Sequence, residues 1–152
     1  MISARTSRPL TIIALALAAG AMSASASGAK LQGDAQNGAQ IYARCGACHA
    51  LTYDRTGPHH CGLFGRRAGS VEGFAYSDAM KHSKIIWTDK SLNRFIANPL
   101  KALPGTSMGY AGIADAQERA DLIAYLKQQD RSAVCKPLHT DSGSPTQSRA
   151  TK

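Results

Sequence analysis

The sequence predicts an all-α fold of three helices joined by long loops, and three observations lead to this prediction. Apolar residues recur at helical spacing in three separate segments, and no segment alternates apolar and polar residues as a half-buried strand would. Two stretches rich in Gly and Pro, 57–75 and 103–112, separate the helical segments. Loops of this length are too long for a compact core unless another group fills the middle of the domain.

The first expected helix begins near Asp34, because an aspartate is a favoured N-cap residue. Its small and apolar faces are carried by Ala35, Ala39, Ile41, Tyr42 and Cys45. The helix leads directly into the segment CGACH at 45–49.

The middle helix is expected from about Asp89 to Asn98, where Leu92, Phe95 and Ile96 share one side. Pro99 should end it, since the residue before a proline is driven out of the helical conformation.

The last helix is expected to begin near Asp115. Asp115 and Glu118 stand three residues apart, as in a capping box with Asp as the cap. An apolar stripe at helical spacing follows, made of Leu122, Ile123, Tyr125 and Leu126.

Both ends of the chain differ in composition from this domain. Residues 1–26 read as a secretory signal peptide, because Arg5 and Arg8 precede an apolar run at 10–21 and small residues follow it. Cleavage is expected between residues 26 and 29, and an uncleaved N-terminal anchor is the alternative. The tail at 137–152 is rich in Ser, Thr and Pro, which predicts disorder. The folded domain is therefore expected at 33–136.

The chain is basic, with 18 Lys and Arg residues against 10 Asp and Glu and a formal charge of +8. The basic residues are scattered, the longest run is Arg66-Arg67, and only 6% of residues are aromatic, so nothing favours nucleic acid. The charge favours an acidic protein surface as partner. No second apolar segment approaches the length of a membrane span, so we expect a soluble mature protein without stable membrane insertion.

The segment Cys45-Gly46-Ala47-Cys48-His49 is a c-type haem attachment motif. Two thiols at this spacing can add to the two vinyl groups of the porphyrin, and the adjacent histidine can then coordinate the iron. Two alternatives use the same cysteines. A redox disulfide of the thioredoxin kind requires a preceding strand, which the sequence lacks. A zinc site would need Cys61 with His59 or His60, and would leave the position of His49 unexplained.

The second iron ligand decides the class of function, and the residues leave several candidates. They are Met22, Met80, Met108, His59, His60, His82 and His139. Met22 would be lost with the signal peptide, and His139 lies in the tail. Met108 follows Pro104-Gly105-Thr106-Ser107, a turn that can direct a side chain inward.

At this point the sequence closely resembles the class I cytochromes c, which include mitochondrial cytochrome c and its small soluble bacterial relatives. The resemblance runs from Gly33 to Lys127, about two thirds of the chain. It is carried by CGACH at 45–49, TGPHHCGLFGRRAG at 56–69, GFAYSDA at 73–79, Trp87, NPLKALPGTSM at 98–108, YAGI at 110–113 and ERADLIAYLK at 118–127.

The resemblance implies a cytochrome c fold wrapped around one haem c, held covalently by Cys45 and Cys48. It implies His49 and Met108 as axial ligands of the iron, and Pro58 as the carbonyl that orients His49. It also assigns residues to the haem propionates, namely Arg66, Tyr76, Trp87 and Thr106. Gly38 would permit a close crossing of the first helix over Leu122 and Tyr125 of the last.

The sequence departs from the family pattern beside the expected iron. Phe95 replaces a usual Tyr and Met80 a usual Asn, which removes two hydrogen-bonding groups and predicts a drier haem crevice with a shifted potential. Leu100 and Ser107 replace lysines around the exposed haem edge, where Arg44 and Lys101 remain to dock redox partners.

In the family fold, the loop after the Gly-Pro pair lies near the end of the last helix, which implies a disulfide between Cys61 and Cys135. Two free thiols are the alternative. An exported chain favours the disulfide, because the compartment outside the cytoplasm is oxidising.

Six-coordinate haem with His and Met ligands leaves no iron position for a substrate and raises the reduction potential. The sequence therefore predicts a soluble periplasmic one-electron carrier, monomeric and not an enzyme. It would act between a quinol-oxidising complex or dehydrogenase and a terminal oxidase or reductase. A haem peroxidase would need a displaceable ligand and a distal acid-base residue, for which only His59 and His60 are near. A gas sensor would be five-coordinate.

Overall fold

The computed structural model describes residues 31–136, and within this range the fold is all-α, as predicted. Five helices follow one another: α1 (Ala35–Tyr42), α2 (Asp78–Lys81), α3 (Asp89–Ala97), α4 (Pro99–Ala102) and α5 (Ala116–Asp130). The only β pairing among the described residues is an isolated bridge between Arg67 and Ile86. The expected signal peptide (1–26) and tail (137–152) lie outside the described residues.

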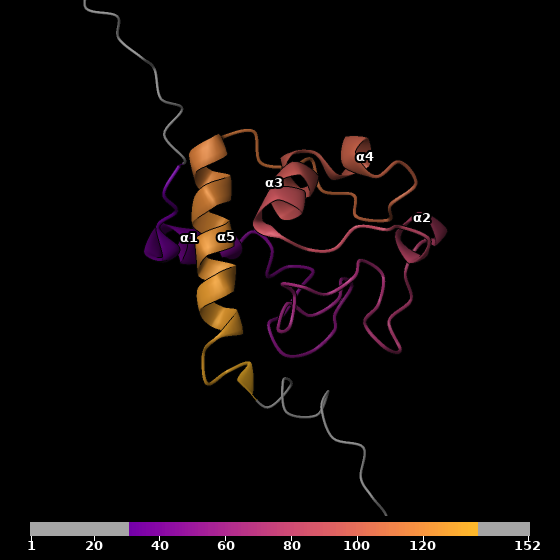
Figure 1. Ribbon diagram of the computed structural model, residues 1–152, viewed down its shortest axis with the longest axis horizontal. Helices are drawn as coiled ribbons and strands as arrows, with labels where there is room; N and C mark the ends of the chain where they lie inside the picture. The colour runs from indigo at the N-terminus through magenta and orange to yellow at the C-terminus, as the bar shows by residue number, and fades with distance from the viewer. Residues whose placement is uncertain (1–30, 137–152) are drawn as a thin grey trace, which may run out of the picture.

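The N- and C-terminal helices pack against each other, with α1 crossing α5 (Figure 1). Gly38 makes this crossing possible. A Cβ atom at Gly38 would lie 2.1 Å from the Asp121 carbonyl oxygen and 2.7 Å from the Tyr125 Cβ. The backbones can approach this closely only because residue 38 has no side chain. The predicted crossing over Tyr125 is thus present, and the backbone of Asp121 shares it.

Polar groups fix the ends of these two helices. Asp34 caps α1 by accepting hydrogen bonds from the backbone N–H groups of Gln36 and Asn37. The Asp34 N–H in turn donates to the buried carboxylate of Asp121 at 2.8 Å, which joins α1 to α5. Asp115 caps α5 by accepting from the Glu118 N–H at 2.8 Å. The expected capping box is only half formed, because the Glu118 carboxylate pairs with Arg44 at 2.9 Å.

The middle helix ends one residue earlier than expected, and Pro99 begins a further short helix. α3 is capped by Thr88, whose side chain forms a reciprocal capping box with Ser91. Asn98 then caps α4, and Pro99 occupies its first turn, where a missing N–H costs nothing. A proline that ends one helix therefore also starts the next.

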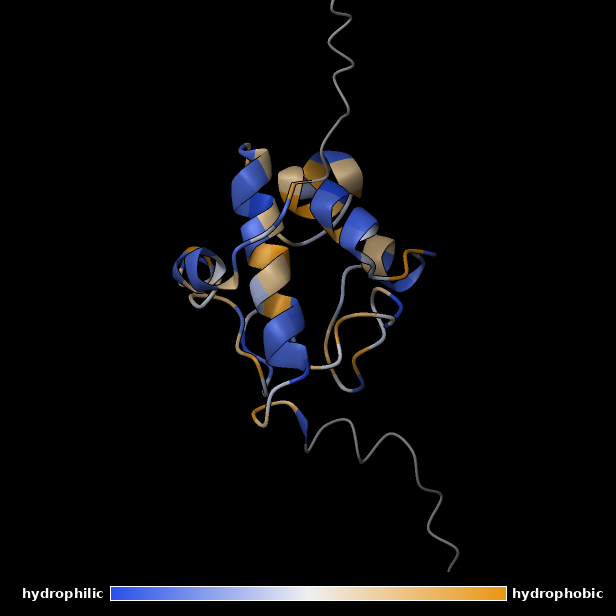
Figure 2. Ribbon diagram, turned by 60° about the vertical axis from the view of Figure 1, so that its left-hand side comes forward, coloured by the Kyte–Doolittle hydropathy of each residue, from blue (hydrophilic) through white to orange (hydrophobic). Residues whose placement is uncertain are grey.

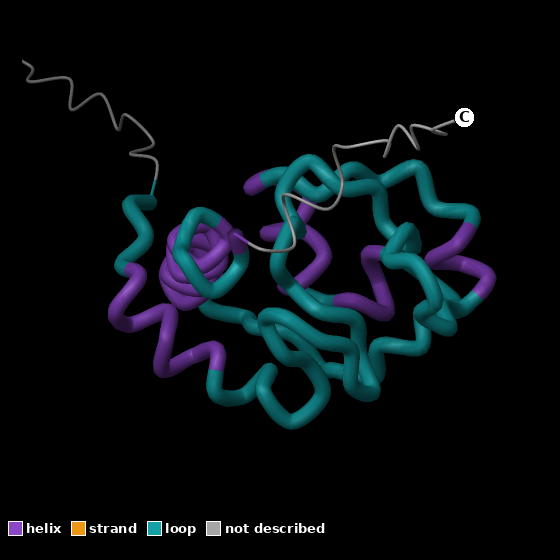
Figure 3. Tube along the Cα trace, turned by 90° about the horizontal axis from the view of Figure 1, so that it is seen from below, coloured by secondary structure: helices purple, strands orange, loops and turns teal. Residues whose placement is uncertain are grey.

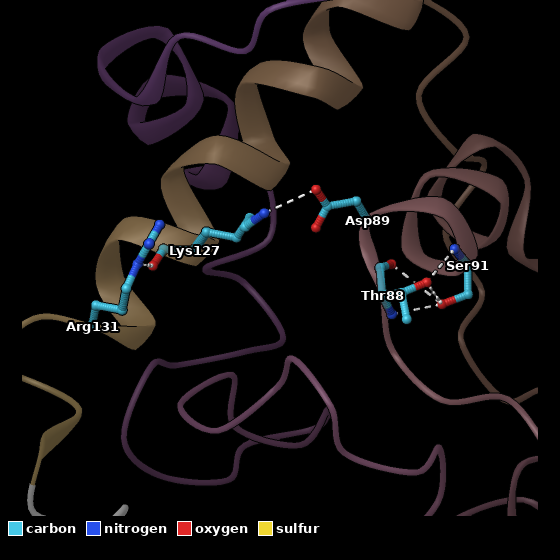
Figure 4. Close-up of polar contacts among 5 residues, drawn as sticks. All are labelled: Thr88, Asp89, Ser91, Lys127 and Arg131. Atoms are coloured by element: carbon cyan, nitrogen blue, oxygen red, sulfur yellow. Dashed lines mark hydrogen bonds and ion pairs between the residues drawn. The ribbon is translucent and has the colours of Figure 1, made fainter. Parts of the chain in front are cut away.

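An ion pair links the start of α3 to α5 at the surface. Figure 4 shows Lys127 reaching from α5 to Asp89, beside the Thr88–Ser91 capping box. The Lys127 Nζ lies 2.9 Å from the Asp89 carboxylate, and Arg131 donates to the Lys127 carbonyl one turn further along. Both charged groups of the pair are partly exposed, so we expect a contribution of about 1 kcal/mol or less.

The apolar side chains of α5 lie in its middle turns, while its two ends are hydrophilic (Figure 2). They join a core cluster drawn from α1, α3 and the loops. Seen along α5, much of the remaining chain is loop (Figure 3). No described helix has the length and apolar character needed to span a bilayer. The helices therefore provide most of the buried core cluster, and Leu63, Ala68, Trp87 and Ile113 of the loops complete it.

Candidate functional site

A cavity of about 460 Å³ lies between the helices and the long loops. Its lining is mostly apolar and includes Leu63, Leu92, Ile96, Leu122 and Leu126. A volume of this size is in the range of cavities that hold a small molecule or cofactor. The long loops of the sequence predict such a space, because loops of this length need another group to fill the middle of the domain.

The predicted site residues converge on this cavity from distant parts of the chain. All nine residues assigned to the cofactor or its iron line it: Cys45, Cys48, His49, Pro58, Arg66, Tyr76, Trp87, Thr106 and Met108. They come from the turn after α1, the loop before α2, the segment before α3 and the loop before α5. Only the fold could bring these segments together.

The CGACH segment forms a tight turn directly after α1. The His49 N–H donates to the Cys45 carbonyl at 2.9 Å, and the Cys48 N–H donates to the same oxygen at 3.0 Å. This turn places both thiols on the cavity wall, where Cys45 is half-buried and Cys48 is exposed. Neither thiol is oxidised to a disulfide. The arrangement gives no support to the redox-disulfide alternative.

The zinc alternative also fails, because Cys61 is bonded to Cys135. The Cα atoms of this pair are 5.2 Å apart, an ordinary disulfide spacing. No group of three or more His, Cys, Asp or Glu side chains among the described residues could hold a metal ion. The disulfide joins the pair that the family resemblance implied, and it fixes the end of α5 to the loop that follows Pro58.

His49 is held in one tautomer. Its Nδ1 lies 2.7 Å from the Pro58 carbonyl oxygen, which can only accept, so Nδ1 carries the proton and Nε2 keeps its lone pair. Burial lowers the pKa of His49, and the Pro58 hydrogen bond opposes part of that shift. A Cβ atom at Gly57 would lie 2.3 Å from the ring, so no larger residue fits there. His49 is thus a neutral imidazole with a free nitrogen on the cavity wall.

A second histidine lies against the first, which the sequence did not predict. The ring of His60 is stacked on that of His49, with centroids 4.4 Å apart and an angle of 20° between the planes. Its Nδ1 is 3.1 Å from the Tyr42 hydroxyl oxygen. Burial lowers the pKa of His60 well below its ordinary value, and the nearby side chains of His49, Arg66 and His59 add to this effect. The ring is therefore neutral.

Arg66, Tyr76 and Trp87 also line the cavity. The two ends of the Arg66 guanidinium donate to the carbonyls of Cys61 and His59 at 3.0 and 2.9 Å. Burial lowers the pKa of Arg66 and raises that of Tyr76, and each of these two groups opposes part of the other's shift. The backbone N–H of Trp87 donates to the Arg66 carbonyl at 2.9 Å, which holds the two residues side by side.

Met108 reaches the cavity from the loop between α4 and α5. Gly105 has a φ of +86°, which lets the chain turn sharply before it. Thr106 is buried, and its hydroxyl accepts from the Met108 N–H at 3.3 Å. Phe95 and Met80 line the same cavity and are both buried. The other methionine candidate, Met22, and His139 lie outside the described residues.

The remaining histidine candidates are occupied elsewhere. His82 is exposed at the end of α2, and its Nδ1 lies 2.8 Å from the Asp78 carbonyl. His59 pairs with Asp54 at 2.7 Å and does not line the cavity. Of the described candidates, only His60, Met80 and Met108 line the cavity.

Comparison with known proteins gives a consistent result. Residues 35–130 match the family model for cytochrome c. The chain is 46% identical to cytochrome c2 of Blastochloris viridis over 98 residues, which is 62% of this chain and 77% of the relative. It is also 46% identical to cytochrome c of Euglena viridis, covering 62% of this chain and 96% of the relative. The structure of cytochrome cH from Methylobacterium extorquens superposes with a TM-score of 0.62 at 41% identity, covering 63% of this chain and 99% of that one.

Proposed function

This chain belongs to the cytochrome c family, whose members carry electrons and are not enzymes. We propose that it is a periplasmic one-electron carrier between a quinol-oxidising complex or dehydrogenase and a terminal oxidase or reductase. The chain itself is a mono-haem c-type cytochrome, and Cys45 and Cys48 hold its one haem c. The observation that carries the proposal is the cavity, whose wall joins both thiols and His49 to Met108.

The residues of the cavity fit a covalent haem. The walls are apolar, as a porphyrin face requires, and the two thiols stand on one side with a tautomerically fixed imidazole beside them. The polar residues Arg66 and Tyr76 also line the cavity and could pair with the carboxylates of the group. When bound, the group supplies an iron that accepts and returns one electron.

We assign His49 and Met108 as the two axial ligands. His49 presents its Nε2 lone pair, and the Pro58 carbonyl increases the basicity of the ring by accepting the Nδ1 proton in a hydrogen bond. Met108 presents its thioether from the Gly105 turn. The propionates are assigned to Arg66, Tyr76, Trp87 and Thr106, all on the cavity wall. With both axial positions filled, no substrate can reach the iron, which suits electron transfer.

The histidines around the cavity do not favour a peroxidase. Its acid-base residue would have to face the side opposite His49, yet His60 stacks on His49 itself and His59 is outside the cavity lining. Neither histidine is therefore placed to act as the acid-base residue of a peroxidase.

Electron exchange would take place at the cavity edge flanked by Arg44 and Lys101. Arg44 lines the cavity, and both side chains belong to exposed residues. Arg44 also pairs with Glu118, which reduces its free charge. Leu100 is 53% exposed and lies where a lysine is usual. The docking surface thus combines few charges with an apolar contact, and we expect a monomer that binds its partners transiently.

The location is proposed from the composition of residues 1–26. Residues 1–26 have the composition of a signal peptide cleaved between 26 and 29, and residues 137–152 that of a polar tail on the 33–136 domain. Export would place the carrier in the periplasm. The mass of the protein isolated from the periplasmic fraction tests this directly, because a mature chain that still begins at Met1 would contradict it.

Rapid-mixing kinetics test the carrier role. The purified holoprotein is mixed with the quinol-oxidising complex or dehydrogenase of the same cell, and then with its terminal oxidase or reductase. We expect one-electron reduction by a donor from the first group and oxidation by an acceptor from the second, at rates that fall with ionic strength.

Lys101→Glu and Lys90→Glu provide a matched pair, because both lysines are exposed and only Lys101 is assigned to the docking edge. Lys101→Glu should slow the exchange roughly threefold or more at low salt, whereas Lys90→Glu should have little effect. Equal slowing by the two variants would contradict the proposed docking edge. Absence of exchange with every donor and acceptor would contradict the carrier role.

A further inference from the structure

The stacked pair formed by His49 and His60 is not accounted for by haem attachment. The two rings are nearly parallel, with centroids 4.4 Å apart, and the Nδ1 edge of the His60 ring contacts the hydroxyl of Tyr42 in α1. We propose that His60, held by Tyr42, is a positioning residue that fixes the plane of the His49 imidazole against the haem. The inference rests on the proposed function in one respect, the assignment of His49 as an axial ligand.

The backbone of His60 is itself tied to the segment that follows His49. The His60 N–H lies within 3.1 and 3.2 Å of the carbonyls of Ala50 and Leu51, and the Cys61 N–H donates to Leu51 at 2.8 Å. The next residue, Cys61, is buried and bonded to Cys135. The two stacked residues therefore lie on chain segments whose backbones are hydrogen-bonded to each other. These bonds fix the backbone beneath both rings.

His49 then has contacts of two kinds. The Pro58 carbonyl holds the Nδ1 edge, and a hydrogen bond to a carbonyl tolerates a broad range of angles. A flat side chain against the ring face limits the tilt that this hydrogen bond allows. The edge contact thus sets the tautomer, and the face contact sets the plane.

The Tyr42 hydroxyl supplies the reason for a histidine at position 60. The tyrosine is half-buried, packs against Tyr125 with centroids 5.1 Å apart, and points its oxygen at the His60 Nδ1 from 3.1 Å. A leucine at position 60 could fill the volume but could not receive this contact or stack as a plane. The α1–α5 crossing is thereby coupled to the orientation of the axial imidazole.

The plane of an axial imidazole determines how unpaired electron density is spread over the four haem methyl groups of the ferric state. Proton NMR of the ferric holoprotein therefore reads the orientation directly. The test uses His60→Leu, which removes the stack, His60→Phe, which keeps a flat ring, and Tyr42→Phe, which releases His60 without changing volume. Matched controls are His82→Leu and Tyr53→Phe, at exposed positions outside the cavity lining.

We expect His60→Leu to change the order or the spread of the four methyl shifts well beyond the change in His82→Leu. His60→Phe keeps a flat ring but loses the Tyr42 contact, so its change should be smaller than that of His60→Leu and similar to that of Tyr42→Phe. Both smaller changes should still exceed that of Tyr53→Phe. The red absorption band of ferric Met-ligated haem should persist in every variant, because the ligands themselves are retained.

An unchanged methyl pattern in His60→Leu would overturn the inference, even if that variant were less stable, since a packing role alone moves stability and not the pattern. If His60→Leu gives no holoprotein, Tyr42→Phe decides, and a pattern equal to that of Tyr53→Phe overturns it. Absence of the red band from wild type would instead contradict the Met108 assignment in the proposed function. The inference needs only His49 as a ligand, so the methyl pattern of His60→Leu would still decide it.

Discussion

The two walls of the haem cavity are built by different means. The His49 wall is held by hydrogen bonds, a ring stack and a disulfide: Pro58 accepts from His49, His60 lies on its face, and Cys61 is bonded to Cys135. A second group of lining residues, which we call the Met108 wall, consists of Met108 with the buried apolar side chains of Phe95 and Met80. One wall is fixed by directional contacts, and the other is fixed by packing.

This difference separates two properties of the carrier. Removal of any one contact of the His49 wall should disturb the position of His49, because each of these contacts is directional and short. The packed wall can change the polarity around the iron by single substitutions that leave the backbone in place. We therefore expect stability to depend mainly on the first wall and the reduction potential on the second.

Removal of the disulfide should have the largest effect on stability. The bond closes a loop across a sequence separation of 74 residues, so its loss frees the unfolded chain and should cost about 3–5 kcal/mol. Cys61→Ser with Cys135→Ser is compared with wild type by denaturant unfolding of the ferric holoprotein. Val134→Ser is the control, because Val134 is 51% exposed in the same turn and the bond is retained.

Two outcomes would contradict this prediction about the disulfide. A loss below about 1 kcal/mol in the double variant would mean that the other contacts of the His49 wall suffice. Two reactive thiols in denatured wild-type holoprotein would mean that the disulfide does not form. Persistence of the red band in the double variant would support the separation of the two walls, since the Met108 wall should not depend on the disulfide.

Polar substitutions in the Met108 wall should move the potential in opposite directions. Phe95→Tyr offers the thioether a hydrogen bond, which makes it a poorer donor to ferric iron and should raise the midpoint potential. Met80→Asn brings polar atoms into a dry site, which stabilises the ferric charge and should lower it. Each shift should stay within about 59 mV, the value that corresponds to a tenfold change in a one-electron equilibrium.

Spectroelectrochemistry measures both midpoints, and Leu92→Met serves as a control that changes the cavity lining without adding a strong hydrogen-bonding group. Unchanged potentials in both polar variants would remove the assigned role of the Met108 wall. The unfolding free energies should fall by less than in the disulfide variant, which keeps the two walls distinct.

Much of the fold was predictable, because its signals are local. The caps at Asp34 and Asp115 and the stripes of α3 and α5 are read within a few residues, and the structure confirms the all-α class. The four-residue helices α2 and α4 were not predicted. A single turn has no period to detect, and Pro99 read as a stop when it is also a start.

The site was predictable only in part, and for a different reason. The Cys45–His49 spacing carries its own chemistry, whereas Met108 and the pairing of Cys61 with Cys135 came from the family resemblance. The stack of His60 on His49 had no signal at all. Eleven positions of sequence separation say nothing of ring planes, which depend on the backbone ties between 50–51 and 60–61. The donation of Arg66 to two loop carbonyls was hidden for the same reason.

The most direct test of the iron ligands compares the two methionines that line the cavity. The red absorption band of the ferric holoprotein is recorded for wild type, Met108→Ala and Met80→Ala, since both residues line the cavity and only Met108 is assigned to the iron. We expect a band in wild type, its loss in Met108→Ala and its retention in Met80→Ala. A band that survives in Met108→Ala, or one that disappears in Met80→Ala alone, would contradict the assignment of His49 and Met108 as the ligands of this haem.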